Sequence, residues 1–213
     1  MMKAIKLVML VPLLFFCALT QADMNSGLSR IQNAWALANY QTPADDQEQA
    51  FEKLVAEARK LADANPDSAE PKIWLAIVLS TDAGVTGGLG ALGKVKESRK
   101  LLEAAEKFNP DALNGSIYTS LGSLYYQVPG WPIGFGDDEK AEQYLKKALA
   151  MNPDGIDPNY FYGDFMLEED NYQQAVSYLE KAAAAAPRPG RQLADKGRNA
   201  EVQEKLAAAR KKL

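Results

Sequence analysis

The most constraining feature of the sequence is a short motif that returns at the end of successive helical stretches. Asn-Pro-Asp occurs at residues 65–67, 109–111 and 152–154, each time after an alanine-rich amphipathic segment. Because proline cannot continue a helix, each motif predicts a helix end followed by a turn. Pro187 closes a fourth such stretch, and it lies 34 residues after Pro153. This spacing predicts a repeated unit of two helices with a 34-residue period.

Small residues recur at the positions where the two helices of such a unit would touch. Their spacing in the last unit is the one that the tetratricopeptide repeat (TPR) requires. The preceding unit fits the same register once an insertion of seven residues is allowed between its helices. These positions are Gly163, Ala175, Leu179 and Ala182 in the last unit, and Gly122, Ala141, Leu145 and Ala148 in the one before it.

The repeats predict an all-α, TPR-like superhelix of about four helical hairpins followed by a C-terminal helix. A helical bundle with prolines placed by chance is the alternative. In the TPR interpretation, no single hairpin buries its apolar face alone, and stacking the hairpins forms a continuous core. The expected helices are residues 27–40 with 46–64, 69–80 with 94–108, 115–127 with 137–151, 157–168 with 171–185, and a terminal helix at 191–212.

The N-terminus has the pattern of a secretory signal peptide. Lys3 and Lys6 are followed by an almost wholly apolar run from Leu7 to Leu19. This run is shorter than the roughly 20 residues of a membrane-spanning helix. We expect cleavage of residues 1–22 after Ala22, which leaves a single domain at 23–213 and directs it to the periplasm. An uncleaved anchor helix is the alternative.

The only cysteine, Cys17, lies inside this segment. Lipid attachment requires a small residue just before the cysteine, and Phe16 stands there, so a lipid anchor is not expected. The mature chain would then contain no cysteine, and its stability must come from packing rather than from disulfides.

The composition argues against catalysis. The sequence contains no histidine, which removes the commonest general base and the commonest metal ligand. We therefore predict that the protein is not an enzyme and carries no metal or cofactor. The formal net charge is −4, and we expect no nucleic-acid partner.

Charge is distributed unevenly along the chain. Residues 188–213 contain eight basic and three acidic side chains, whereas the preceding part is acidic. A solvated helix face is the simplest interpretation. The alternatives are that this tail docks on the acidic body of the protein or on an anionic partner.

The first helix of each hairpin should line the concave wall of the superhelix, where TPR-like arrays bind partners. This wall is expected to be neutral to acidic and to lack a Lys/Arg clamp for a peptide carboxylate. It would suit an apolar or cationic ligand, or a basic segment of a partner protein. For the two tyrosines, packing between hairpins is an equally good interpretation. The predicted binding residues on this wall are Ile77, Thr119, Ser123, Tyr126, Tyr160 and Asp164.

A glycine-rich stretch matches two phosphate-binding patterns. Residues 88–93 fit GxGxxG, and residues 88–94 fit GxxxxGK. Both motifs require a preceding strand, but residues 74–79 fit the TPR register as a helix, and Val95 stands where a magnesium-binding Ser or Thr would be. We therefore expect no nucleotide site, and interpret residues 84–93 as a flexible apolar loop.

A second insertion, residues 128–137, combines two prolines and three glycines with large apolar side chains. Proline and glycine prevent a helix here. Trp131, Ile133 and Phe135 alternate along it, and an exposed apolar patch of this kind marks a binding surface. A loop folded back as a plug over the core is the alternative. Asp137 or Asp138 is expected to cap the following helix.

Three segments resemble the TatT, or T-component, family of TPR-like proteins associated with TRAP (tripartite ATP-independent periplasmic) transporters. They are Leu-Gly-Ser-Leu-Tyr-Tyr at 121–126, Pro-Gly-Trp-Pro-Ile-Gly-Phe-Gly-Asp at 129–137, and Ala-Leu-Ala-Met-Asn-Pro-Asp-Gly-Ile-Asp at 148–157. The resemblance is strongest over residues 114–187. It implies a periplasmic accessory protein that partners the transporter's solute-binding subunit. It also implies a trimer, with a pore or pockets for hydrophobic ligands. Without the resemblance, the repeats are equally consistent with a generic cell-envelope adaptor in outer-membrane or cell-wall assembly.

Overall fold

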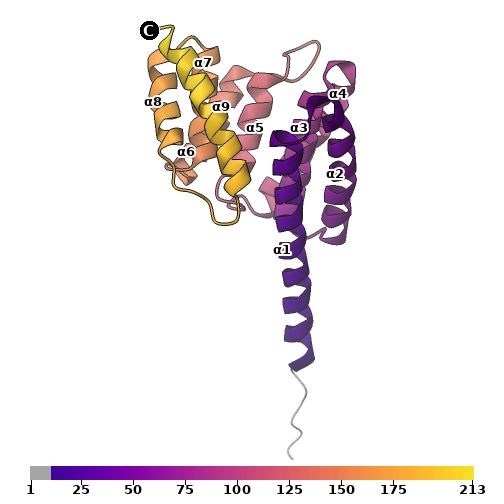
Figure 1. The fold of residues 1–213 in the computed structure, drawn as a ribbon. Helices are drawn as coiled ribbons and strands as arrows, with labels where there is room; N and C mark the ends of the chain where they lie inside the picture. Colours follow the sequence, from indigo (N-terminus) through magenta and orange to yellow (C-terminus); the bar gives the residue numbers. More distant parts are fainter. Residues whose placement is uncertain (1–10) are drawn as a thin grey trace, which may run out of the picture.

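The computed structural model describes residues 11–213, with side chains from Ala22 onward apart from that of Leu89. Within this range all regular secondary structure is helical, as the repeats predicted (Figure 1). The helices are α1 (Val11–Tyr40), α2 (Ala44–Ala64), α3 (Ala69–Thr86), α4 (Gly88–Phe108), α5 (Ser116–Gln127), α6 (Asp138–Met151), α7 (Ile156–Glu168), α8 (Tyr172–Ala183) and α9 (Gln192–Arg210).

The expected signal peptide lies partly outside the described residues. Helix α1 begins at Val11 and continues through the expected cleavage point after Ala22, so cleavage stays a prediction. Among the described residues, no helix is both long enough and apolar enough to cross a membrane.

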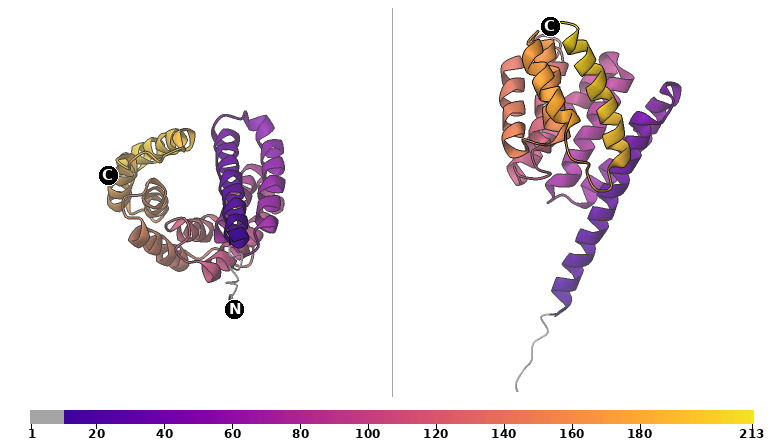
Figure 2. Two further views of the ribbon diagram at one scale, coloured as in Figure 1. Left: turned by 90° about the horizontal axis from the view of Figure 1, so that it is seen from below. Right: turned by 60° about the vertical axis from the view of Figure 1, so that its left-hand side comes forward.

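The helices form an inner and an outer layer that curve around a common centre (Figure 2). The inner layer consists of α1, α3, α5, α7 and α9, each in contact with the next, and α9 in turn contacts α1. The outer layer consists of α2, α4, α6 and α8, and each of these packs on the inner helix that precedes it. The two ends of the array therefore meet, and the inner helices form a closed ring.

In each of the second, third and fourth hairpins, three small or apolar residues of the outer helix pack against the inner helix. They are fully buried, and their spacing of four and then three residues keeps them on one face of a helix. On the inner helix of each of the last two hairpins, a glycine lets the outer helix approach closely. An ideal Cβ at Gly122 would lie 2.5 Å from Leu145 Cγ. The outer-helix sets are Ser98, Leu102 and Ala105 in α4, Ala141, Leu145 and Ala148 in α6, and Ala175, Leu179 and Ala182 in α8.

The prediction of a flexible loop at residues 84–93 is wrong. Helix α3 continues to Thr86 and α4 begins at Gly88, so Gly87 alone separates them. Gly87 has φ of 63°, the left-handed conformation that glycine adopts without strain. The extra residues of this hairpin lengthen both helices instead of forming a loop.

A polar cluster joins the two helix ends at this turn. Lys94 Nζ forms an ion pair with Asp82 Oδ2 at 2.8 Å and donates a hydrogen bond to Thr86 Oγ1 at 2.6 Å. The Asp82 side chain is only 4% exposed, so a charged partner is needed there. This pairing accounts for Lys94 without a phosphate ligand.

The basic C-terminal tail docks on the body of the protein. Lys205 pairs with Asp164 at 2.7 Å and Arg210 with Glu180 at 2.7 Å. At the other end of α9, an ideal Cβ at Gly197 would lie 2.4 Å from the Tyr40 ring. Helix α9 therefore approaches α1 at a position that has no side chain. Of the alternatives that the charge distribution left open for the basic tail, docking on the acidic body is the correct one.

We predict that Gly122→Ala destabilises the protein. The added methyl group would overlap Leu145, which is fully buried, and overpacking of this kind costs about 1–3 kcal/mol. Thermal unfolding should show a melting temperature lower by roughly 2–10 °C. The matched control is Gly93→Ala in α4, where a Cβ meets no atom within 4 Å. That change should be neutral or stabilise by about 0.5–1 kcal/mol. Equal effects of the two substitutions would contradict the close helix contact.

Candidate functional site

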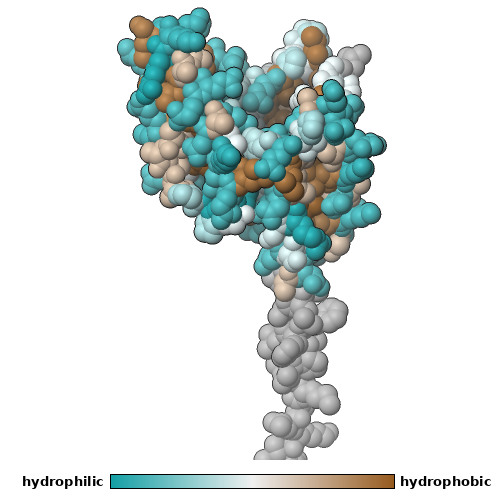
Figure 3. Space-filling view, viewed as in Figure 1, coloured by the Kyte–Doolittle hydropathy of each residue, from teal (hydrophilic) through white to brown (hydrophobic). Residues whose placement is uncertain are grey.

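The main hollow of the protein is a cavity of about 920 Å³ bounded by inner-layer helices. Its lining includes residues of α1, α3, α5, α7 and α9 and of the turn before α9. Figure 3 shows the surface hollowed between the side that carries α9 and the side that carries α1. A cavity of this size accommodates a small organic molecule or a short peptide segment.

Four of the predicted wall residues line this cavity. Ile77 comes from α3, Thr119 and Ser123 from α5, and Tyr160 from α7. The four side chains come from three different hairpins, so the TPR register brings together residues that are up to 83 positions apart in the sequence.

Tyr126 and Asp164, which were predicted for the same wall, contact each other instead. The Tyr126 hydroxyl donates to Asp164 Oδ2 at 2.8 Å, and Lys205 of α9 pairs with Asp164 Oδ1 at 2.7 Å. Burial and the Asp164 carboxylate raise the pKa of Tyr126 well above its ordinary value. These residues hold α5, α7 and α9 together and are absent from the cavity lining.

The expectation of a wall without basic residues is wrong. Arg188, Arg191 and Arg198 all line the cavity, brought there by α9 and the turn before it. The first helix of each hairpin was expected to line the wall, and the terminal helix occupies that same inner layer. The basic excess of residues 188–213 was the signal that could have identified these arginines.

Two of these arginines, Arg188 and Arg198, share the carboxylate of Asp157. Arg198 Nε donates to Asp157 Oδ1 at 3.0 Å, and Arg188 pairs with the other oxygen of the same carboxylate. Arg188 also pairs with Asp195 at 2.7 Å, and Arg198 with Glu201. Burial tends to raise the pKa of Asp157, but the Arg198 and Arg188 guanidiniums outweigh it and hold this pKa below its ordinary value.

Aromatic side chains form much of the remaining wall, and most of them were not predicted from the sequence. Trp35 and Trp74 line the cavity and are 7% and 5% exposed, with their rings edge to face at 6.3 Å. Trp35 Nε1 donates to Thr81 Oγ1 at 2.9 Å. The Arg198 guanidinium lies 4.3 Å from the centre of the Tyr160 ring, a distance typical of a cation–π contact.

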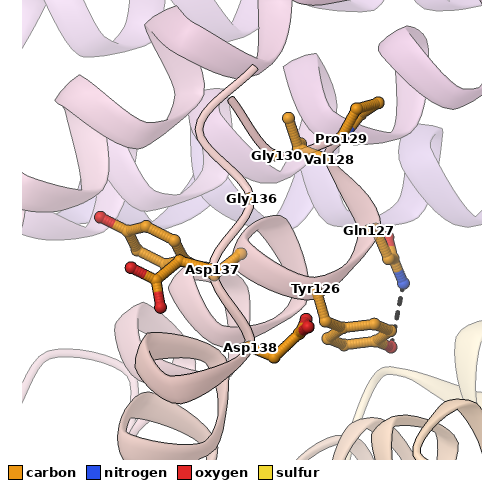
Figure 4. Close-up of a pocket in the computed structure, with 9 residues that line it drawn as sticks. Tyr126, Gln127, Val128, Pro129, Gly130, Gly136, Asp137 and Asp138 are labelled. Atoms are coloured by element: carbon orange, nitrogen blue, oxygen red, sulfur yellow. Dashed lines mark hydrogen bonds between the residues drawn. The ribbon is translucent and has the colours of Figure 1, made fainter. Parts of the chain in front are cut away.

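The second insertion lies at the C-terminal end of α5 and borders a smaller hollow of about 320 Å³ (Figure 4). Gln127 Nε2 donates to the Tyr126 hydroxyl at 3.0 Å, as Figure 4 shows. The chain turns back on itself so tightly that a Cβ at Gly136 would lie 1.9 Å from the Val128 carbonyl oxygen. Asp137 caps α6 by accepting a hydrogen bond from Lys140 N, in agreement with the sequence.

The three apolar side chains of this insertion have different roles. Phe135 packs edge to face on Tyr125 at 5.6 Å, and the Arg99 guanidinium lies 4.3 Å from its ring centre. Trp131 and Ile133 are 89% and 61% exposed. The insertion is therefore a plug at Phe135 and an exposed apolar surface at Trp131 and Ile133, so each of the two predicted alternatives describes one part of it.

Comparison with known proteins supports the architecture. The fold is TPR-like. Residues 133–209 match a family model described as tetratricopeptide repeat. The structure of TTC0263, a thermophilic TPR protein of Thermus thermophilus, aligns over 87% of this chain and 98% of its own, with a TM-score of 0.57 and 16% identity.

A structure from a functional characterisation of Pseudomonas aeruginosa pilF covers 88% of this chain and 90% of its own. Its TM-score of 0.36, at 17% identity, is too low to carry a structural argument. No curated protein matches the sequence significantly. The family-model match and the Thermus thermophilus structure show the architecture, and TPR-type helical proteins present concave surfaces that bind partners.

We predict that Asp157→Asn loosens the attachment of α9. Asp157 is the shared partner of Arg188 and Arg198, and hydrogen bonds to charged groups contribute about 1.5–3 kcal/mol. Because the Asp157 side chain is 31% exposed, we expect the free energy of unfolding to fall by about 1–2 kcal/mol. Chemical denaturation at pH 7 would measure this change. The control is Asp154→Asn, which removes the same charge from an exposed position on the same cavity.

The destabilisation caused by Asp157→Asn should depend on pH in a defined direction. A carboxylate whose pKa is lowered in the folded state stabilises the protein above its unfolded-state pKa, near 4. That contribution is lost as the pH falls through the lower folded-state value. The stability difference between the wild type and Asp157→Asn should therefore be constant from about pH 6 to 8 and shrink below about pH 4. A difference that grows on acidification would contradict the pairing.

Proposed function

We propose that this protein is a non-catalytic binding protein of the cell envelope that holds a ligand in its central cavity. The observation that carries the proposal is the cavity of about 920 Å³, lined by the inner helix of every hairpin and by α9. Its wall combines aromatic rings with many polar and charged side chains. Aromatic rings supply contact area for a ligand, and polar groups fix its orientation.

More specifically, we propose a periplasmic accessory component that partners the solute-binding protein of a TRAP-type transporter. Support comes from the secretory pattern of residues 1–22, from the resemblance of residues 114–187 to the T-component family, and from the exposed Trp131 and Ile133. Exposed tryptophan is enriched among the residues that dominate protein–protein binding energies. Assembly into a trimer is part of the same proposal.

The alternative is a generic adaptor in outer-membrane or cell-wall assembly. The observation that favours it is the same exposed surface at Trp131 and Ile133, which can bind a protein without any ligand in the cavity. The two functions differ in whether the cavity is occupied and in which proteins are captured.

Occupancy of the cavity is tested by native mass spectrometry of protein purified from envelope extracts. The proposal expects a complex heavier than the chain by the mass of a small molecule, which is released on denaturation. The same spectrum reports the oligomer. A monomer of the bare chain mass, together with no captured solute-binding subunit, would exclude the transport version.

For partner binding, we predict that the double change Trp131→Ala and Ile133→Ala weakens capture of a purified solute-binding subunit at least about tenfold. Removal of a central aromatic contact typically costs about 2 kcal/mol or more in binding. The melting temperature should stay unchanged, because both side chains are exposed. Biolayer interferometry would measure the affinity.

The matched control for this experiment is Phe108→Ala. This substitution removes a 54% exposed aromatic ring at the end of α4, outside the second insertion, and binding should persist. Full affinity in the double variant would contradict the assigned surface. Crosslinking in cells that recovers envelope-assembly factors in place of transport proteins would support the adaptor.

A further inference from the structure

Arg191 differs from the two other arginines of the cavity in its partners. Among the described residues it forms no ion pair, and its Nε is buried without a hydrogen-bond acceptor. Its guanidinium lies 4.9 Å from the centre of the Trp74 ring. A buried guanidinium donor without an acceptor is unfavourable, so the native fold keeps an unsatisfied donor at this place.

The surrounding charges do not compensate this cation. Burial and the positive charge of Arg188 lower the pKa of Arg191, and they outweigh the attraction of Asp157 and Asp195. The nearby carboxylates are already engaged, since Asp157 and Asp195 hold Arg188 and Glu201 holds Arg198. An added anion at Arg191 would supply the missing partner.

The wall next to Arg191 suits an apolar body. Trp74 packs under the guanidinium, Trp35 packs on Trp74, and Ile77 and Val85 line the same cavity. Trp74 Nε1 is a second buried donor that has no acceptor in the described part of the chain. An acidic head group that carries an apolar chain or ring would meet both the donors and the aromatic wall.

We propose that the cavity binds a monocarboxylate, with its head group on the Arg191 guanidinium and its apolar body against Trp74 and Trp35. The planar guanidinium matches a carboxylate with two parallel hydrogen bonds. A single negative charge is favoured over two, because Arg188 and Arg198 are already paired with carboxylates and leave Arg191 as the cavity arginine that can take an added anion. This inference rests on the proposed ligand-binding function, and it names the chemical class of the ligand.

The test uses two probes that differ only in the head group, 4-phenylbutanoate and 4-phenylbutanol. Binding is followed by calorimetry and by tryptophan fluorescence in a Trp131→Phe background. That change leaves Trp35 and Trp74, both in the cavity wall, as the reporters among the three tryptophans. The acid should bind at least about tenfold more tightly than the alcohol.

In Arg191→Gln, affinity for the acid should fall by about 10–100-fold, the loss expected for a charged hydrogen-bonded pair. Affinity for the alcohol should change by less than about twofold, since the Trp wall is intact. The matched control is Arg210→Gln at the C-terminal end of α9, whose partner Glu180 lies on the exposed surface. It should bind both probes as the wild type does. The melting temperature of each variant shows whether α9 has remained in place.

The outcomes separate this inference from the proposed function. Equal binding of acid and alcohol, or equal losses of both in Arg191→Gln, would overturn the carboxylate site and leave a cavity that binds apolar ligands. Binding of neither probe would contradict both proposals. A peptide with a free C-terminal phenylalanine, compared with its amidated form, supplies the same head group from a second source. Preference for the free peptide over both small probes would assign the carboxylate to a polypeptide end.

Discussion

The architecture depends on the attachment of α9 through Asp157. This carboxylate stands in the first turn of α7 and pairs with Arg188 before α9 and Arg198 within it. Acidic residues are favoured at a helix N-terminus because of the helix dipole, so Asp157 suits its position in α7 independently of its partners. Together with the buried Val202, Leu206 and Ala209 of α9, the pairing holds the last helix in the inner layer.

Closure of the ring follows from this attachment. Once α9 lies beside α7, its N-terminal part reaches α1, and Gly197 allows it to pack against the Tyr40 ring. TPR-like arrays form open superhelices with concave surfaces. Here the contact between first and last helices turns the concave surface into a cavity. It also brings Arg198 onto the Tyr160 ring. The cavity is therefore a consequence of the packing of α9 between α7 and α1.

The helices could be predicted well from the sequence because their limits are set by local signals. Proline and small residues in register define the helices of the last two hairpins, and α5 at Ser116–Gln127 lies within one residue of the expected 115–127. The prediction for the glycine-rich stretch failed because glycine disfavours a helix by only about 1 kcal/mol. Packing of the long α3 and α4 against each other outweighed that preference.

The site was harder to predict than the fold, for an electrostatic reason. A count of charges shows that residues 188–213 are basic, but it does not reveal which carboxylates they meet. That information lies in long-range contacts such as Arg198 with Asp157, which are 41 positions apart. The repeat register identified wall residues on α3, α5 and α7, but it assigned the terminal helix to no hairpin and so identified none of the wall residues on α9.

Helix α5 relates the two proposed binding surfaces to each other. Thr119 and Ser123 face the cavity, and Gln127 borders both the cavity and the hollow at the base of the second insertion. From Gln127 a chain of contacts runs through Tyr126 and Asp164 to Lys205 on α9. Contiguity of this kind does not by itself transmit binding energy. Coupling would require two arrangements of these contacts with different affinities for the ligand, and the closed inner ring favours one arrangement, so ligand and partner should bind independently.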